Sequence, residues 1–197
     1  MHTGWMQVGN QWKYYSQGTL KIYGKTFVDG EKVTGWLPLG NRWYYIANDD
    51  YMVTGYYKVG NSTYYFDESG LMQTGWFKIN GEDYYATSSG AIQAQWVKSL
   101  SNWYYVDVDG KMVTGYQTIN GAKYYFASSG LMQKGWFKIN GEDYYAASSG
   151  TIQAQWVKSG RNWYYVDTDG KMVTGDYIID RKVNYFDNQG LWMNKIN

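Results

Sequence analysis

Residues 75–86 read GWFKINGEDYYA, and this stretch predicts a β-hairpin. The dipeptide Asn80-Gly81 is a strong signal for a two-residue type I′ turn, because both central residues of that turn need a positive φ. We expect one short strand over residues 76–79 and a second over 83–86, followed by a turn at residues 88–90. No sustained 3.6-residue period interrupts this pattern, so the sequence predicts an all-β protein.

The hairpin unit recurs every 20 residues through most of the chain. Its restarts fall at Gly35, Gly55, Gly75, Gln95, Gly115, Gly135, Gln155 and Gly175. Residues 4–17 form a unit without its tail and residues 18–34 a shortened unit, which gives about ten units. Self-similarity at so short a period predicts an array in which each unit buries its apolar face against its neighbours. We therefore expect a single module over residues 1–197, irregular over 4–34 and regular over 35–194.

A second period of 60 residues lies on top of the first. Residues 75–114 and 135–174 are nearly identical, and three types of unit alternate. One type carries two tryptophans, the next has Tyr56 or Tyr116 in place of the first, and the third has Asp83 or Asp143 in place of the second. The tryptophan pairs are Trp36 and Trp43, Trp96 and Trp103, and Trp156 and Trp163. We interpret Trp192 and Met193, which depart from the usual tail of a unit, as a cap on the last unit.

Composition excludes several classes of function. The formal net charge is +1 and no run of basic residues occurs, which argues against nucleic acid and membrane surfaces as partners. No stretch approaches the roughly 20 apolar residues of a membrane span. The chain has no cysteine, and its D-x-D-G turns lack the further oxygen ligands of a calcium loop, so we expect neither a metal nor another cofactor.

Catalysis has little support in the sequence. His2 is the only histidine, so a Ser-His-Asp arrangement is excluded. Glu82 and Asp83 are neighbours in a predicted strand and point to opposite faces, which suits no glycosidase pair. The 23 tyrosines and 11 tryptophans instead indicate an aromatic core and an aromatic surface. We expect a binding protein and not an enzyme.

The recurring pattern G-W…W-Y-Y…D-G-K-M-V-T-G resembles the choline-binding, or cell-wall-binding, repeats of Gram-positive bacteria and their phages. Related repeats occur in glucan-binding domains of glucosyltransferases and in clostridial toxins. The resemblance implies a β-solenoid, a superhelix of stacked β-hairpins, with ligand sites between consecutive hairpins. In that family a box of three aromatic rings, often with a methionine nearby, holds choline. Aromatic faces suit a trimethylammonium group, because it is a weakly hydrated cation without hydrogen-bond donors.

Strand geometry maps this box onto residues of the chain. Side chains two apart in a strand share a face, so Trp103 lies with Tyr105, and Trp96 on the partner strand can close the box. We expect the second tyrosine of the next unit as the third wall and the unit's own methionine as the floor. The expected cages are Trp36, Trp43, Tyr65 and Met52; Trp96, Trp103, Tyr125 and Met112; and Trp156, Trp163, Tyr185 and Met172.

Weaker sites are expected at four other tryptophans. Trp5 and Trp12 form a pair, but the shortened second unit offers no matching tyrosine. Trp76 and Trp136 belong to units that lack the second tryptophan. There, Asp83 and Asp143 are interpreted as polar hairpin residues that face water.

The sequence thus predicts an extracellular, cell-wall-associated module that binds phosphocholine of teichoic acids, with no signal peptide in this chain and any catalytic domain outside it. One alternative is a module for glucan or another surface glycan, since aromatic rings also stack on sugars. A second alternative is a structural spacer or a host-protein adhesin, in which the rings only stabilise the stack. Sequence alone leaves these alternatives and the oligomeric state open.

Overall fold

The computed structural model describes residues 2–193, and paired antiparallel strands make up its regular structure. The pairs are β1 (Gly4–Val8) with β2 (Gln11–Tyr15), β3 (Leu20–Ile22) with β4 (Lys25–Phe27), β5 (Gly35–Leu39) with β6 (Arg42–Ile46), β7 (Gly55–Val59) with β8 (Ser62–Phe66), β9 (Gly75–Ile79) with β10 (Glu82–Ala86), β11 (Gln95–Ser99) with β12 (Asn102–Val106), β13 (Gly115–Ile119) with β14 (Ala122–Phe126), β15 (Gly135–Ile139) with β16 (Glu142–Ala146), β17 (Gln155–Ser159) with β18 (Asn162–Val166), and β19 (Gly175–Ile179) with β20 (Lys182–Phe186), which also pairs with β21 (Trp192–Met193). Residues 2–193 contain no helix, and so none that could cross a membrane.

The two-residue turns have the backbone that the sequence predicts. Asn80 and Gly81 have φ values of 51° and 85°, as a type I′ turn requires. Ile79 and Glu82 pair directly on either side of this turn. In the units that read Gly-Asn, a positive φ occurs at the glycine alone, as at Gly60 with 61°, which matches the alternative type II′ turn. The predicted hairpin over residues 75–86 is therefore confirmed.

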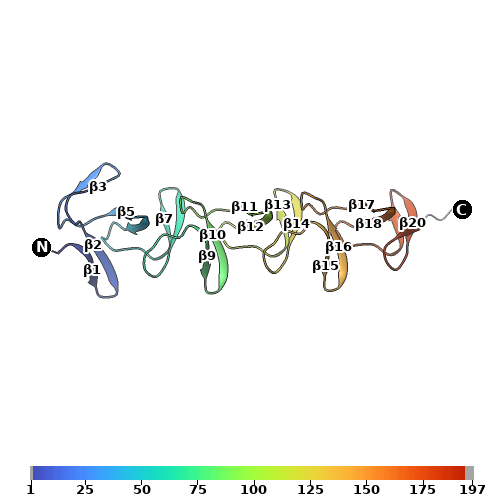
Figure 1. Cartoon of the computed structure of the whole chain (residues 1–197), viewed down its shortest axis with the longest axis horizontal. Coiled ribbons are helices and arrows are strands. Elements are labelled where there is room, and N and C mark those ends of the chain that lie inside the picture. Colours follow the sequence, from blue (N-terminus) through green and yellow to red (C-terminus); the bar gives the residue numbers. More distant parts are fainter. Residues whose placement is uncertain (1, 194–197) are drawn as a thin grey trace. The chain divides into compact units, whose positions relative to one another are not determined.

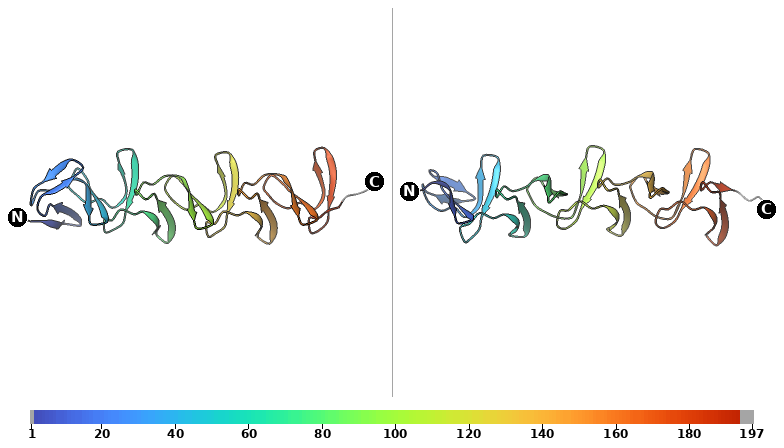
Figure 2. Two further views of the ribbon diagram at one scale, coloured as in Figure 1. Left: turned by 45° about the horizontal axis from the view of Figure 1, so that its top comes forward. Right: turned by 90° about the horizontal axis from the view of Figure 1, so that it is seen from below.

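The described chain forms two compact units. The first comprises residues 2–95 and 106–112, and the second comprises residues 96–105 and 113–193. Within the first, the hairpins from β1–β2 to β9–β10 follow one another along the unit (Figure 1). Neighbouring hairpins of one unit, such as β7–β8 and β9–β10, project in different directions from their connecting loops (Figure 2). The expected fold class, an all-β solenoid of stacked hairpins, is confirmed within each unit; that residues 1–197 act as one module remains a prediction.

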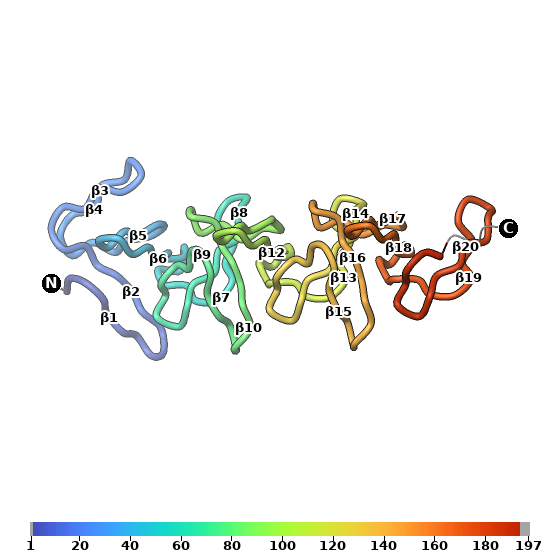
Figure 3. The backbone as a smooth tube through the Cα atoms, turned by 45° about the vertical axis from the view of Figure 1, so that its right-hand side comes forward, coloured from blue at the N-terminus to red at the C-terminus, as the bar shows by residue number. Residues whose placement is uncertain are grey.

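The loop after each hairpin reaches back to an earlier hairpin. Figure 3 shows these loops as wide bends between the strand pairs. The backbone N–H of Met132, in the loop after β14, donates a hydrogen bond of 2.9 Å to the carbonyl of Trp103 in β12. Met72 makes the same bond of 2.9 Å to the carbonyl of Trp43. In these two cases the loop ties its hairpin to the preceding one by a backbone hydrogen bond.

The core is a series of small clusters between hairpins. In the hairpins from β5–β6 onward, the last residue of the second strand is fully buried, as at Phe66 and Phe126. The preceding tyrosine stacks on the next hairpin: the ring centroids of Tyr125 and Phe137 lie 5.4 Å apart. Because an isolated two-stranded hairpin is barely stable in water, these inter-hairpin contacts carry the stability of each unit.

Two tyrosine hydroxyl groups connect segments that are 53 residues apart. The hydroxyl of Tyr56 donates a hydrogen bond of 2.9 Å to the carbonyl of Asp109, and Tyr116 donates one of 2.9 Å to the carbonyl of Asp169. Burial raises the pKa of Tyr56 to about 12, with a smaller contribution from neighbouring tyrosines and aspartates. Burial also raises the pKa of Tyr116. The tyrosine that replaces the first tryptophan in these 20-residue repeats therefore has a structural role, because its hydroxyl group holds a distant turn by a hydrogen bond.

Replacing Tyr56 by phenylalanine should lower the free energy of unfolding by about 0.5–1.5 kcal/mol, because the hydrogen bond to Asp109 is lost. Denaturant unfolding followed by circular dichroism measures this change. Tyr57→Phe is the matched control, since the hydroxyl of Tyr57 makes no hydrogen bond among the described residues. Equal effects of the two substitutions would contradict a stabilising hydrogen bond from Tyr56 to Asp109.

Stability should fall between about pH 10 and pH 12. In the unfolded chain a tyrosine loses its proton near pH 10, whereas folded Tyr56 keeps it until about pH 12. Above pH 10 the unfolded state therefore binds fewer protons than the native state, so the stabilisation is complete below pH 10 and is lost as the pH rises. Denaturant unfolding at pH 9 and pH 11.5 tests this, and Tyr56→Phe should show a smaller loss than the wild type.

Candidate functional site

Hairpin register gathers aromatic side chains on one face. In the β17–β18 hairpin, Trp156 pairs with Tyr165 across the two strands, and Trp163 lies two residues before Tyr165 on the same face. The indoles of Trp156 and Trp163 are 6.4 Å apart and nearly perpendicular, at 86°. The corresponding pair Trp96 and Trp103 has a separation of 6.2 Å at 86°. This face therefore presents two perpendicular indole walls toward the next hairpin.

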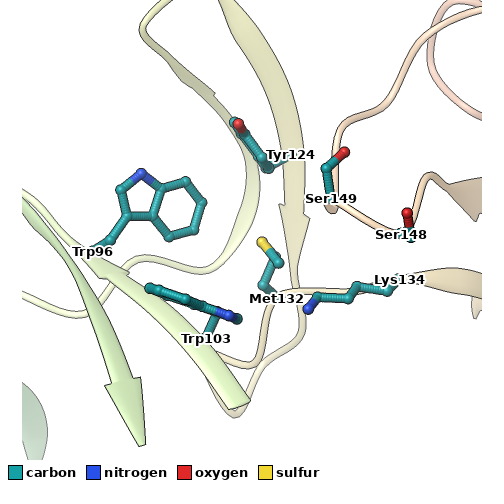
Figure 4. Close-up of a pocket in the computed structure, with 7 residues that line it drawn as sticks. All are labelled: Trp96, Trp103, Tyr124, Met132, Lys134, Ser148 and Ser149. Atoms are coloured by element: carbon teal, nitrogen blue, oxygen red, sulfur yellow. The ribbon is translucent and has the colours of Figure 1, made fainter. Parts of the chain in front are cut away.

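The next hairpin and the loops after it and after the following hairpin supply the remaining walls of a pocket. Beside Trp96 and Trp103, a pocket of about 470 Å³ is lined further by Tyr124, Met132, Lys134, Ser148 and Ser149. We call this set of seven residues the Trp96 cage. The ring of Tyr124 lies 5.0 Å from Trp96 at 72°. Figure 4 shows the two indoles, the tyrosine ring and the sulfur of Met132 around a common space.

The first compact unit, residues 2–95 and 106–112, contains two pockets with the same frame. The Trp36 cage, of about 490 Å³, is lined by Trp36, Trp43, Tyr64, Met72, Tyr23, Asn41, Thr74, Ser88 and Ser89. The Trp5 cage, of about 340 Å³, is lined by Trp5, Trp12, Tyr44, Met52, Glu68 and Ser69. The centroid distances from the first tryptophan to the tyrosine are 4.8 Å for Trp36–Tyr64 and 5.2 Å for Trp5–Tyr44. Three cages thus share a Trp-Trp-Tyr-Met frame.

The Trp156 cage has a different third wall. Its pocket of about 290 Å³ is lined by Trp156, Trp163 and Trp192. Trp192 lies 5.4 Å from Trp156 at 74°, close to the arrangement of Tyr124 beside Trp96. Asn184 stands where the other units have the tyrosine, and its side-chain carbonyl accepts a hydrogen bond of 3.1 Å from the Trp192 indole N–H. The structure therefore places Trp192, which we interpreted as a cap, in the wall of a cage.

The third wall comes from a different tyrosine than the sequence analysis expected. We expected Tyr65, Tyr125 and Tyr185, but Tyr64 and Tyr124 line the pockets. Tyr125 shares its face with Tyr116, at 4.9 Å, and stacks forward on Phe137. Tyr65 likewise stacks on Phe77, at 5.3 Å. Adjacent residues of a strand point to opposite faces. The face of a hairpin that carries Tyr124 is turned toward the preceding hairpin, and the face that carries Tyr125 is turned toward the following one.

The methionines are displaced by one hairpin for the same kind of reason. We expected Met52, Met112 and Met172 under the tryptophans of their own units. Because each loop reaches back, Met132 and Met72 line the Trp96 and Trp36 cages instead. Met52 lies in the Trp5 cage. The backbone N–H groups of Met112 and Met172 donate hydrogen bonds to the carbonyls of Asp83 and Asp143, respectively.

Four tryptophans that were expected to give weaker sites fall into two groups. Trp5 and Trp12 form a complete frame, because Tyr44 of the third hairpin closes it and the short β3–β4 hairpin is bypassed. Trp76 packs on Tyr85 at 5.2 Å, and Trp136 on Tyr145 at 5.2 Å. In the two latter hairpins, lysines form ion pairs with the expected water-facing aspartates: Lys78 with Asp83 at 2.6 Å, and Lys138 with Asp143 at 2.7 Å.

The cages offer aromatic faces and a thioether to a ligand. Aromatic faces attract cations within about 6 Å of a ring centroid, and ligand sites are typically concave and mostly apolar with a few polar groups. Among residues 2–193, no group of three or more His, Cys, Asp or Glu side chains could hold a metal ion. The Asp107 carboxylate accepts hydrogen bonds from the N–H groups of Asp109 and Lys111, at 3.0 and 2.9 Å, which makes this segment a turn.

A signal for the missed wall residues exists in the sequence. The tyrosine at positions 44, 64 and 124 recurs with a methionine eight residues later, at 52, 72 and 132. In the last unit both change together, to Asn184 and Trp192. This joint exchange fits the hydrogen bond between Asn184 and Trp192, whereas Tyr84 and Tyr144 keep the tyrosine with an isoleucine eight residues later.

Two family models for repeats match parts of the chain. A family model for the choline-binding repeat matches residues 33–72, 53–96 and 113–156, and a model for a cell wall binding repeat matches residues 95–112 and 155–172. No curated protein sequence matches the chain significantly.

Three solved structures from Streptococcus pneumoniae illustrate the similarity of fold. The choline-binding domain of CbpL has a TM-score of 0.63 at 25% identity, with 98% of each chain covered. The modular autolysin LytC has a TM-score of 0.60 at 22% identity, covering 98% of this chain and 48% of that chain. Choline binding protein F has a TM-score of 0.51 at 24% identity, covering 96% and 92%.

The methionine of the Trp96 cage rests on a glycine, and this contact can be tested. A Cβ on Gly150 would overlap the sulfur of Met132, whereas a Cβ on Gly141 would meet no atom within 4 Å. Both glycines have nearly the same φ, +85° and +86°, so alanine costs about 1–2 kcal/mol at either for backbone strain alone. Gly150→Ala should cost about 0.5–1.5 kcal/mol more than Gly141→Ala, because the flexible end of the buried Met132 side chain must leave its rotamer. Denaturant unfolding measures the difference, and equal losses would contradict the packing.

Proposed function

The chain belongs to the choline-binding repeat family, and from this premise we propose that it attaches a protein to the Gram-positive cell wall by holding choline groups in its aromatic cages. The observation that carries the proposal is the recurrent frame of two indoles, a third ring and a thioether around a solvent-open pocket. Association with the cell wall is the location that the matching repeat families imply. The module itself acts by binding, and any catalytic activity belongs to a partner domain.

The chemistry of the cage suits a quaternary ammonium group. Such a cation is bulky and weakly hydrated, and it makes no directional hydrogen bonds, so it is best held by several ring faces at once. An ordinary ammonium group would leave its three N–H donors unsatisfied against indole and thioether surfaces. Each cation–π contact contributes about 0.5–2 kcal/mol, which gives weak individual sites.

The biological ligand that we propose is the phosphocholine of teichoic acids. Such a polymer carries many choline groups, and the chain carries several cages. Once one cage is engaged, the others meet their ligands at a high effective concentration, so the overall affinity rises far above that of one cage. Weak individual sites are therefore sufficient for firm attachment.

A glycan remains the second candidate, and one observation favours it. The Trp36 cage places Asn41, Thr74, Ser88 and Ser89 beside its rings, and sugar recognition combines an aromatic face with hydroxyl and amide groups. The apolar Trp156 cage, lined by three tryptophans alone, provides none of these groups. Choline is the ligand that all four cages can accept.

Choline at millimolar concentration should change tryptophan fluorescence and raise the melting temperature, because a ligand that binds only the native state stabilises it. Calorimetric titration should show one fewer site in Trp103→Ala than in the wild type. Leu100→Ala is the control, since Leu100 is 92% exposed at a hairpin tip and lines no cage. A glucan oligosaccharide serves as the competing ligand in the same measurements.

The proposal would be contradicted if neither the fluorescence nor the melting temperature changed up to about 100 mM choline, a concentration far above the Kd of sites of this strength. Stabilisation by the oligosaccharide alone would establish the glycan function. Stabilisation by neither would leave a structural role for the rings.

A further inference from the structure

The cages share their aromatic frame but differ in the charge at their rims. Lys134 lines the Trp96 cage at the position where Thr74 lines the Trp36 cage, 60 residues earlier. The rim pair contributed by a later turn is Ser148-Ser149 in the Trp96 cage and Ser88-Ser89 in the Trp36 cage. The corresponding pair in the Trp5 cage is Glu68-Ser69. The three rims are therefore cationic, neutral and anionic.

Lys134 is available to a ligand. It makes no ion pair or hydrogen bond among residues 2–193, and its side chain is exposed. Its amino group is directed toward Met132 and the ring of Trp103 (Figure 4). A second cation stands at the same indole, because the Nζ atom of Lys98 lies 5.7 Å from the centroid of the Trp103 ring. The Trp36 cage has Pro38 at the position equivalent to Lys98.

A cation at the rim changes which ligand the cage prefers. It repels a free quaternary ammonium ion, but it attracts a phosphate that is attached to that ion by a short linker. A carboxylate such as that of Glu68 has the opposite effect on both ligands. The charge of the group that accompanies the ammonium ion therefore decides the preference of each cage.

We infer that rim charge makes the Trp96 cage a phosphocholine site, with Lys134 as the phosphate-binding residue, whereas the Trp5 cage prefers quaternary ammonium ions that carry no adjacent anion. This inference rests on the proposed function, because it assumes that the cages hold such ions. It assigns specificity to Lys134 and Glu68, which lie outside the aromatic frame.

The test resolves the cages within one intact chain. The protein is labelled with 5-fluorotryptophan, and the fluorine signals are assigned by single Trp→Phe variants. Choline and phosphocholine are then titrated separately, and the ratio of their Kd values is measured at each cage. Exposed ion pairs are weak, so the wild-type ratio at the Trp96 cage should favour phosphocholine by about two- to fivefold relative to the Trp36 cage.

Substitutions at the rim distinguish the effect of the rim charge from that of the aromatic frame on ligand preference. Lys134→Thr should move the ratio at the Trp96 cage part of the way toward that of the Trp36 cage, because Lys98 remains beside Trp103, and Thr74→Lys should shift the Trp36 cage toward phosphocholine. Glu68→Gln should do the same at the Trp5 cage. Raising the salt concentration to 0.5 M should reduce these differences, because exposed charges are screened, while choline binding persists.

The outcomes distinguish the inference from the proposed function. Unchanged ratios in Lys134→Thr and Thr74→Lys, with choline still bound, would overturn the inference alone. No response of any indole to either ligand would overturn the proposed function. Cosedimentation with purified choline-bearing cell wall and with phosphatidylcholine vesicles identifies the source of the phosphocholine, and a loss on Lys134→Thr in either assay supports the inference.

Discussion

The edge contact between a tryptophan of one hairpin and a ring on the back of the next is the interaction on which the structure depends. A two-stranded hairpin has two faces and too little mass to bury either alone. The contact of Trp96 with Tyr124, repeated by Trp36 with Tyr64 and Trp136 with Tyr164 at 4.8–5.4 Å, joins the front of one hairpin to the back of its successor. Where that contact has a second tryptophan beside it, the space left over is a cage. Structure and binding therefore use the same rings.

Local features could be predicted from the sequence because they depend on neighbouring residues. The Asn80-Gly81 turn fixes two positive φ values, and strand alternation places Trp103 and Tyr105 on one face. The unit boundaries follow from the 20-residue period, and the tryptophan pairs indicate where the cages form.

The partners across a junction could not be derived in this way. Choosing between Tyr124 and Tyr125 requires knowledge of which face of the next hairpin is turned toward the cage. That choice depends on the bend of the loop between them, which no strand periodicity encodes. The methionine of the cage could not be predicted for the same reason. Met132 is held beside the Trp96 cage by the hydrogen bond from its backbone N–H to the carbonyl of Trp103, and this contact depends on how the loop folds back. The short β3–β4 hairpin adds a case in which a whole unit is bypassed.

The assembly of the Trp96 cage from three successive hairpins has a consequence for how such a chain changes its length over generations. The indoles of the Trp96 cage come from one hairpin, Tyr124 and Met132 from the second, and Ser148-Ser149 from the loop after the third. Loss or gain of a single 20-residue unit gives the hairpins on either side new neighbours of the wrong type. Unequal recombination by 60 residues instead restores every surviving junction. The pattern of junctions thus repeats every three hairpins, although the repeating structural element is one hairpin.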